Sequence, residues 1–216
     1  MNTKTLTVLQ NNMIFKIRKP ETEANGNVWF LIHGWTGDEN SMDPFWRYIP
    51  DHHWIVAPRA PEEAHPSGYG WADVTPSMYP NYEQFLPSVK KLYKEMMQFL
   101  KDNQLSDKTI NLFGFSQGAA ASYMLTEMVQ DQVDIVIPTA GFMPAGTLSH
   151  IQGIRNKTIR FMVYHGAKDN LVPSSMADDC VAHLKNAGFS THYCLDENAG
   201  HKLGASCIEH LKSIAL

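Results

Sequence analysis

The chain has 216 residues, of which 44% are hydrophobic and 19% charged, and its formal net charge is −4 at pH 7. This length favours one domain with a sizeable core. The mildly acidic charge, without a basic patch, argues against nucleic acid and anionic membrane surfaces as partners. No apolar run approaches the roughly 20 residues of a membrane-spanning helix, so we expect no stable membrane insertion.

Three features of the chain bear on its compartment and on metal binding. The first ten residues, MNTKTLTVLQ, lack the apolar segment of a secretory signal. The three cysteines, Cys180, Cys194 and Cys207, have no C-x-x-C spacing, which favours reduced thiols over a disulfide or a zinc site. None of the ten histidines lies in an H-E-x-x-H or H-x-H motif. We therefore expect a cytoplasmic protein without a catalytic metal.

The N-terminal quarter of the chain predicts mainly strands. Residues 5–9 and 13–18 alternate between apolar and polar side chains around a polar turn, which predicts an antiparallel hairpin at the edge of a sheet. Residues 28–32, VWFLI, are continuously apolar, as in a strand that is buried on both faces. A helical pattern follows over 39–48, and 54–57 is the next short strand.

Beyond this quarter, one irregular stretch precedes a regular alternation of helices and strands. Residues 58–80 are rich in proline, glycine and aromatic side chains, whereas 82–102 predict an amphipathic helix. The later predicted elements are strands at 109–113, 134–139, 159–164 and 191–195, helices at 119–130, 175–187 and 202–214, and a loop region at 142–155. This alternation predicts a mostly parallel sheet with helices on both faces, in one α/β domain over residues 1–216.

Residues 114–118 read GFSQG and lie between a predicted strand and a predicted helix. A serine in a G-x-S-x-G turn between a strand and a helix is the nucleophile elbow of α/β-hydrolase folds. The flanking glycines permit a turn so sharp that the hydroxyl of Ser116 stands exposed above the sheet. The alternative interpretation is a glycine-flanked turn with an ordinary surface serine. We predict an α/β-hydrolase fold with Ser116 as the nucleophile.

A serine hydroxyl needs a base, and the base needs an acid that orients it. In this fold the order along the chain is serine, acid, histidine. Asp169 follows a predicted strand and His201 follows the last predicted strand, so these two residues are the expected acid and base. Asp196 is the alternative acid. Three other histidines, which we interpret as loop, packing or surface residues, are His165, His183 and His192.

The oxyanion hole of such an enzyme needs two backbone N–H groups. One should come from Gln117, directly after the nucleophile and at the positive end of a helix. The other should come from the loop at 33–38, where Trp35 is the first choice and Thr36 the second. The same loop also permits a helix cap in which Thr36 and Glu39 form a capping box.

Five segments carry a resemblance to a known family, namely HGWTGD at 33–38, APRAP at 57–61, GFSQG at 114–118, HGAKD at 165–169 with LVP at 171–173, and GH at 200–201. From about residue 28 onward the chain resembles the phospholipase/carboxylesterase family of small serine hydrolases, which also includes acyl-protein thioesterases. The resemblance implies hydrolysis of esters or thioesters of small acyl groups, without a cofactor. By position it implies a triad of Ser116, Asp169 and His201, with oxyanion donors at Trp35 and Gln117.

Two departures from the family pattern bear on the substrate. Trp35 stands where a leucine-like residue is usual, so we expect its ring to narrow the acyl pocket, and residues 66–73 differ from those of the thioesterases. We therefore predict a serine carboxylesterase, monomeric or homodimeric, that acts on small short- to medium-chain acyl esters. The alternatives are an acyl thioesterase or lysophospholipase, and a hydrolase-like fold that only binds ligands.

The substrate should lie under the irregular segment at about 62–80, which we expect to cover the pocket. Aromatic residues of this segment would form its walls, and apolar residues after two later strands would line the acyl side. The expected substrate contacts are Tyr69, Trp71, Phe142, Met143 and Leu171.

Overall fold

The computed structural model describes residues 5–20, 26–74, 79–204, 206 and 208–209. The strands are β1 (Thr5–Gln10), β2 (Met13–Arg18), β3 (Val28–Ile32), β4 (Trp54–Pro58), β5 (Glu62–Glu63), β6 (Tyr69–Gly70), β7 (Ile110–Phe115), β8 (Val133–Thr139), β9 (Arg160–Gly166) and β10 (Ser190–Asp196). The helices are α1 (Asp43–Trp46), α2 (Tyr82–Asp102), α3 (Gln117–Met128), α4 (Leu148–Gly153) and α5 (Ser174–Asn186). No helix in these described ranges is long and apolar enough to cross a membrane.

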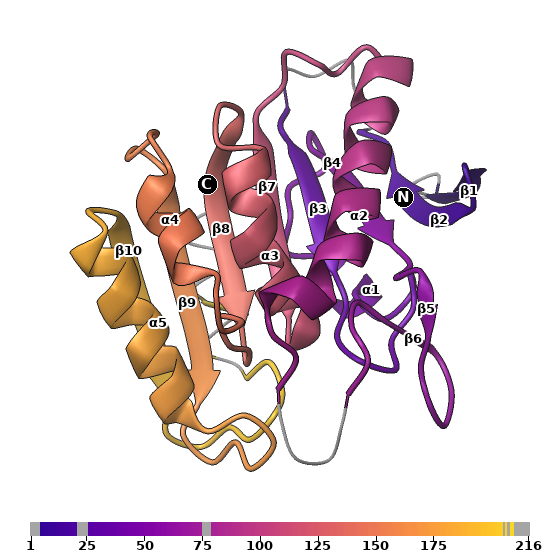
Figure 1. Ribbon diagram of the computed structural model, residues 1–216. Coiled ribbons are helices and arrows are strands. Elements are labelled where there is room, and N and C mark those ends of the chain that lie inside the picture. Colours follow the sequence, from indigo (N-terminus) through magenta and orange to yellow (C-terminus); the bar gives the residue numbers. More distant parts are fainter. Residues whose placement is uncertain (1–4, 21–25, 75–78, 205, 207, 210–216) are drawn as a thin grey trace.

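Eight strands form one sheet in the order β1-β2-β4-β3-β7-β8-β9-β10 (Figure 1). β1 pairs with β2 and β2 with β4 in antiparallel fashion, whereas the pairs from β4 to β10 are parallel. The predicted α/β-hydrolase architecture with its N-terminal hairpin is therefore confirmed.

The sheet is covered on both faces, and β3 shows why its sequence is continuously apolar. Phe30 and Ile32 point into a core shared with α2, α3 and α5, whereas Trp29 and Leu31 pack in a second core with Trp46 of α1. All five residues of β3 are buried. In Figure 1, α2, α3 and α5 lie on the same side of the sheet. A central parallel strand with two buried faces leaves no position for a polar side chain.

The structure corrects two predicted segments. The helix expected over 39–48 is reduced to α1, because side chains of the preceding loop bind its own backbone instead. Asp38 Oδ1 accepts the N–H of Asn40 at 2.9 Å, and the N–H of Asp38 donates to the Ser41 hydroxyl at 2.9 Å. The loop expected over 142–155 contains α4. The predicted helix 202–214 falls mostly outside the described residues.

The register of the parallel strands brings four loops to one edge of the sheet. Ile32 at the end of β3 pairs with Gly114 of β7, and Gly166 at the end of β9 pairs with Asp196 of β10. The loops after these strands carry every residue of the predicted catalytic site. Ligand sites of open α/β sheets lie at the carboxyl ends of their strands.

Candidate active site

Ser116 lies in the turn between β7 and α3, with φ 56° and ψ −116°. A positive φ is uncommon for serine, so the surrounding chain must hold this conformation. Its N–H donates to the carbonyl of Thr139 at 2.9 Å. A Cβ atom at Gly114 would clash with the carbonyl oxygen of Gly118, and one at Gly118 would clash with that of Ile32. The turn therefore requires both glycines of the motif.

Three side chains from separate loops form one hydrogen-bonded chain. His201 Nε2 lies 3.1 Å from Ser116 Oγ, and His201 Nδ1 lies 2.7 Å from Asp169 Oδ2. The other carboxylate oxygen, Asp169 Oδ1, accepts the N–H groups of Leu171 and Val172, each at 2.9 Å. With Nδ1 donating to the buried carboxylate, Nε2 is free to accept the serine proton. This is the geometry that serine hydrolysis requires.

The alternative acid, Asp196, has other partners. Its carboxylate accepts the hydroxyl of Ser206 at 2.6 Å, that of Tyr164 at 3.0 Å and the N–H of Asn198 at 3.0 Å. The Ser206 hydrogen bond is the main reason that the pKa of Asp196 lies below its usual value. These contacts tie Asp196 to the neighbouring chain and leave Asp169 as the carboxylate that contacts His201.

The loop after β3 passes directly beside Ser116. A Cβ atom at Gly34 would lie 3.0 Å from Ser116 Cβ. Trp35, Thr36 and Gln117 line the same cavity as Ser116. The structure thus brings both expected oxyanion donors, and the second choice Thr36, to the wall of the reaction site. Thr36 has φ 63° and its hydroxyl donates to the carbonyl of Trp35 at 2.6 Å, so it does not form the capping box with Glu39.

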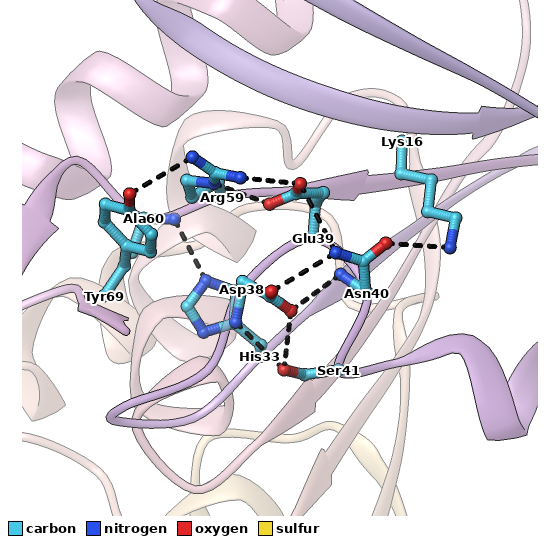
Figure 2. A network of polar contacts seen from close by, with 9 residues as sticks. All are labelled: Lys16, His33, Asp38, Glu39, Asn40, Ser41, Arg59, Ala60 and Tyr69. Carbon is cyan, nitrogen blue, oxygen red and sulfur yellow. Dashed lines mark hydrogen bonds and ion pairs between the residues drawn. The ribbon is translucent and has the colours of Figure 1, made fainter. Parts of the chain in front are cut away.

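A partly buried ion pair fixes the far end of this loop (Figure 2). Arg59 donates to both carboxylate oxygens of Glu39, at 2.6 and 2.7 Å, and its guanidinium lies 4.5 Å from the centre of the Tyr69 ring. Burial alone would raise the pKa of Glu39, but the hydrogen bonds from Arg59 hold it below its usual value. The N–H of Tyr69 donates to the carbonyl of Gly37 at 2.9 Å. The Arg59 guanidinium thus connects the loop after β3, through Glu39, to β6, through Tyr69.

His33 fixes the near end of the loop. Its Nε2 accepts the N–H of Ala60 at 3.0 Å (Figure 2). This leaves Nδ1 to donate to the carbonyl of Gly34 at 2.7 Å. Burial lowers the pKa of His33, so the ring is neutral at pH 7. The carbonyl of His33 accepts the indole N–H of Trp71 at 2.8 Å.

Arg59→Met should destabilise the fold by about 3 kcal/mol, because it leaves a buried carboxylate without its cation. The control is Arg160→Met, which removes an ion pair to Asp134 whose side chains are 50% and 37% exposed. That control should lose less than about 1 kcal/mol. Urea unfolding of both variants measures the difference, and equal losses would contradict a structural role for the Glu39–Arg59 pair.

An apolar cavity of about 430 Å³ opens beside Ser116. This volume lies within the range of small-molecule sites. Besides residues 34–36, Ser116, Gln117 and His201, its lining consists of Val74, Tyr79, Pro80, Phe115, Phe142, Leu171 and Val172. Ser116 therefore faces a cavity whose lining is largely apolar.

Comparison with known proteins agrees with this geometry. The sequence profile of the phospholipase/carboxylesterase family matches residues 12–214. The chain belongs to this family. Its members are hydrolases of the carboxylesterase and acyl-protein thioesterase type.

Family relatives of both types are similar to this chain. A curated relative from Dictyostelium discoideum, acyl-protein thioesterase 1 homolog 2, is 28% identical over 130 residues, which span 56% of this chain and 58% of the relative. The match thus extends over little more than half the length of that relative. The solved carboxylesterase of Bacillus cereus superposes with a TM-score of 0.81 at 16% identity, covering 95% of this chain and 94% of that one. The acyl-protein thioesterase 2 of Zea mays superposes with a TM-score of 0.75 at 16% identity, covering 93% and 96%.

The structure places three of the expected substrate contacts away from the cavity. Trp71 is fully buried. Its indole N–H donates to the carbonyl of His33, and its backbone N–H donates to Gln117 Oε1 at 2.9 Å. Tyr69 packs against Arg59. Met143 lines a separate, smaller cavity of about 180 Å³. A large apolar side chain in a covering segment can serve the core as readily as the substrate.

The predicted contacts Phe142 and Leu171 do line the cavity, and the sequence reasoning missed their partner Tyr79. The Tyr79 hydroxyl donates to the carbonyl of Leu171 at 2.6 Å, and its ring centre lies 4.8 Å from that of Phe142. The sequence signal for Tyr79 was its place in the segment predicted to cover the pocket, next to Pro80. Residues 75–78 of this segment lie outside the described residues.

His165 lies beside this chain of contacts, with its Nε2 3.4 Å from Asp169 Oδ2. His165 Nε2 donates to the carbonyl of Val172 at 2.8 Å and so supports the loop after β9. Cys180 and Cys194 are free thiols, and burial raises the pKa of Cys180 to about 11, whereas Cys207 lies outside the described residues. Among the residues that the structure describes, no cluster of three or more His, Cys, Asp or Glu side chains could hold a metal ion.

Proposed function

We propose that the protein is a serine carboxylesterase that hydrolyses short- to medium-chain acyl esters through an acyl-enzyme intermediate. The observation that carries the proposal is the hydrogen-bonded chain from Ser116 through His201 to Asp169 at the wall of an apolar cavity. Membership of the phospholipase/carboxylesterase family supports the reaction class.

The proposed reaction follows from the roles of these groups. His201 Nε2 takes the proton of Ser116 as its oxygen attacks the ester carbonyl, and Asp169 stabilises the resulting imidazolium without taking the proton itself. The N–H groups of Trp35 and Gln117 bind the oxyanion. The tetrahedral adduct collapses, the C–O bond breaks, and His201 donates its proton to the departing alcohol. Water then repeats the attack on the acyl-enzyme and releases the acid.

A thioesterase or lysophospholipase is the second candidate. The relative from Dictyostelium discoideum carries a thioesterase name, and the same triad serves an alcohol or a thiol as leaving group. Rates on an oxygen ester and a thioester with the same acyl group would rank the two candidates. A higher kcat/KM on thioesters throughout the series would favour the second.

A fluorophosphonate probe tests the proposal directly, because it forms a covalent bond only with an activated serine. We expect labelling at Ser116 and cleavage of p-nitrophenyl esters that declines toward long chains. Labelling without hydrolysis of any ester or thioester would overturn the proposed reaction.

Trp35→Leu should extend the acyl range toward longer chains. The ring lies against the backbone of Gly70, where a Cβ atom would clash with it, and it borders the acyl cavity. Because the backbone N–H remains, kcat on acetate should change little. Each added methylene can contribute about 0.8 kcal/mol of burial, so kcat/KM should rise by at most about fourfold per methylene.

Trp35→Phe, which keeps an aromatic ring, is the matched control and should shift the preference less. An unchanged chain-length profile in Trp35→Leu would show that the ring does not limit the acyl group. A wild-type preference for palmitoyl esters would move the thioesterase or lysophospholipase to first place.

A further inference from the structure

A second cavity, of about 480 Å³, adjoins the acyl cavity at the loop that carries Trp35. The two cavities share five lining residues, namely Gly34, Trp35, Thr36, Phe115 and His201. Ser116 and Gln117 line only the acyl cavity, whereas Lys202 and Leu203 line only the second one. Trp35 and His201 therefore border both spaces.

The reaction chemistry assigns different halves of an ester to these two spaces. The acyl carbon must lie at Ser116, and the departing oxygen must lie within reach of His201 Nε2, which protonates it. The lining of the acyl cavity includes Val74, Phe142 and Leu171, which suit a hydrocarbon chain. The alcohol half, attached at the oxygen beside His201, then extends past Trp35 into the second cavity.

The second cavity differs from the first in charge. Lys202 is the one lysine, and no arginine, aspartate or glutamate joins it, among the described residues that line this space. Its floor carries Met42, Pro44 and Phe45, and Ser41 adds a hydroxyl. The net charge of the whole chain is −4, so the molecule as a whole does not attract anions. Lys202 is thus the residue of this lining that can supply a positive charge to an anionic ligand.

We propose that the second cavity binds the leaving alcohol and that Lys202 selects alcohols that bear an anionic group, such as a carboxylate or a phosphate. This inference rests on the proposed esterase function and names its substrate class. The Lys202 ammonium pairs with the anion while the aliphatic part of the alcohol lies on Met42 and Phe45. The substrate then extends past Trp35, with its carbonyl carbon at Ser116 and its alcohol half in the second cavity.

The test compares butyrate esters that differ only at the end of the alcohol. The first pair is the ester of 3-hydroxypropanoate and the ester of 3-hydroxypropanamide, which have nearly the same shape but differ by one charge. The ester of 2-hydroxyethyl phosphate separates phosphate from carboxylate as the preferred anion. For each ester, kcat/KM is measured from the butyrate released, at low and at high salt.

The wild type should cleave at least one anionic ester with a higher kcat/KM than the carboxamide ester, and high salt should reduce this ratio. Lys202→Met should lower the ratio by about threefold, since the side chain is exposed and its ion pairs are screened. Lys202→Glu should lower it further. Lys90→Met, on the exposed face of α2, makes the same change in net charge and should leave the ratio unaltered.

Two results would overturn the inference alone. The first is cleavage of all the esters by the wild type without a preference for an anion. The second is an equal loss of the ratio in the Lys202 and Lys90 variants. Failure to cleave any ester or to label Ser116 would instead overturn the proposed function, and this inference with it.

Discussion

Ser116→Ala is expected to reduce kcat by about 10⁴-fold or more and to abolish labelling by a fluorophosphonate, with little change in thermal stability. The members of a catalytic triad act as a unit, so removal of the nucleophile removes most of the rate enhancement. Alanine keeps the Cβ atom and loses only the hydroxyl whose contact is His201 Nε2. The fold of the elbow depends on its glycines and on the Ser116 N–H, which alanine retains.

Ser149→Ala, at an exposed position on α4, is the matched control and should keep full activity and labelling. Rates on p-nitrophenyl butyrate and in-gel detection of the probe measure both variants. Continued labelling of Ser116→Ala at another serine would show that the nucleophile lies elsewhere.

Asp169→Asn is expected to reduce kcat by about 10⁴-fold while the fold persists. Two backbone N–H groups, of Leu171 and Val172, point at Asp169 Oδ1, so the oxygen of an asparagine must occupy that position. Its NH₂ group then faces His201 Nδ1, where Asp169 Oδ2 now accepts. The imidazole must take the opposite tautomer and present N–H to Ser116, so it cannot act as the base.

Asp196→Asn, at the alternative acid, is the control and should keep most of the wild-type kcat. Circular dichroism and the thermal midpoint establish that both variants fold. A loss in Asp196→Asn as large as that in Asp169→Asn would reverse the assignment of the acid.

The parts of this fold that the sequence predicted well are those governed by local pattern. β3 reads as five apolar residues because both of its faces are buried, and α2 begins and ends where its apolar face does. The elbow is recognisable because only glycine fits where Gly114 and Gly118 meet neighbouring carbonyl groups. The proposed acid and base, Asp169 and His201, lie where their places after β9 and β10 put them, at hydrogen-bond distance from each other.

The errors arose where specific side-chain contacts, some local and some distant, decide the outcome. The pattern over 39–48 is helical in period, but Asp38 and Ser41 bind the backbone of their own loop. Trp71 lies in a segment whose aromatic composition suggested a pocket wall. Its indole N–H instead donates to the carbonyl of His33 inside the core. Tyr79 reaches the site through Leu171, 92 positions further along the chain. No local pattern carries information about contacts of this range.

In the proposed mechanism, Leu171 joins the recognition of the acyl group to the activation of the nucleophile. Its N–H holds the Asp169 carboxylate, and its carbonyl accepts the hydroxyl of Tyr79 beside the acyl cavity. An acyl group too bulky for the cavity would displace Tyr79 and pull on the same peptide that orients the acid. Selection against large substrates would then lower kcat as well as raise KM, because a misplaced Asp169 carboxylate orients His201 less well.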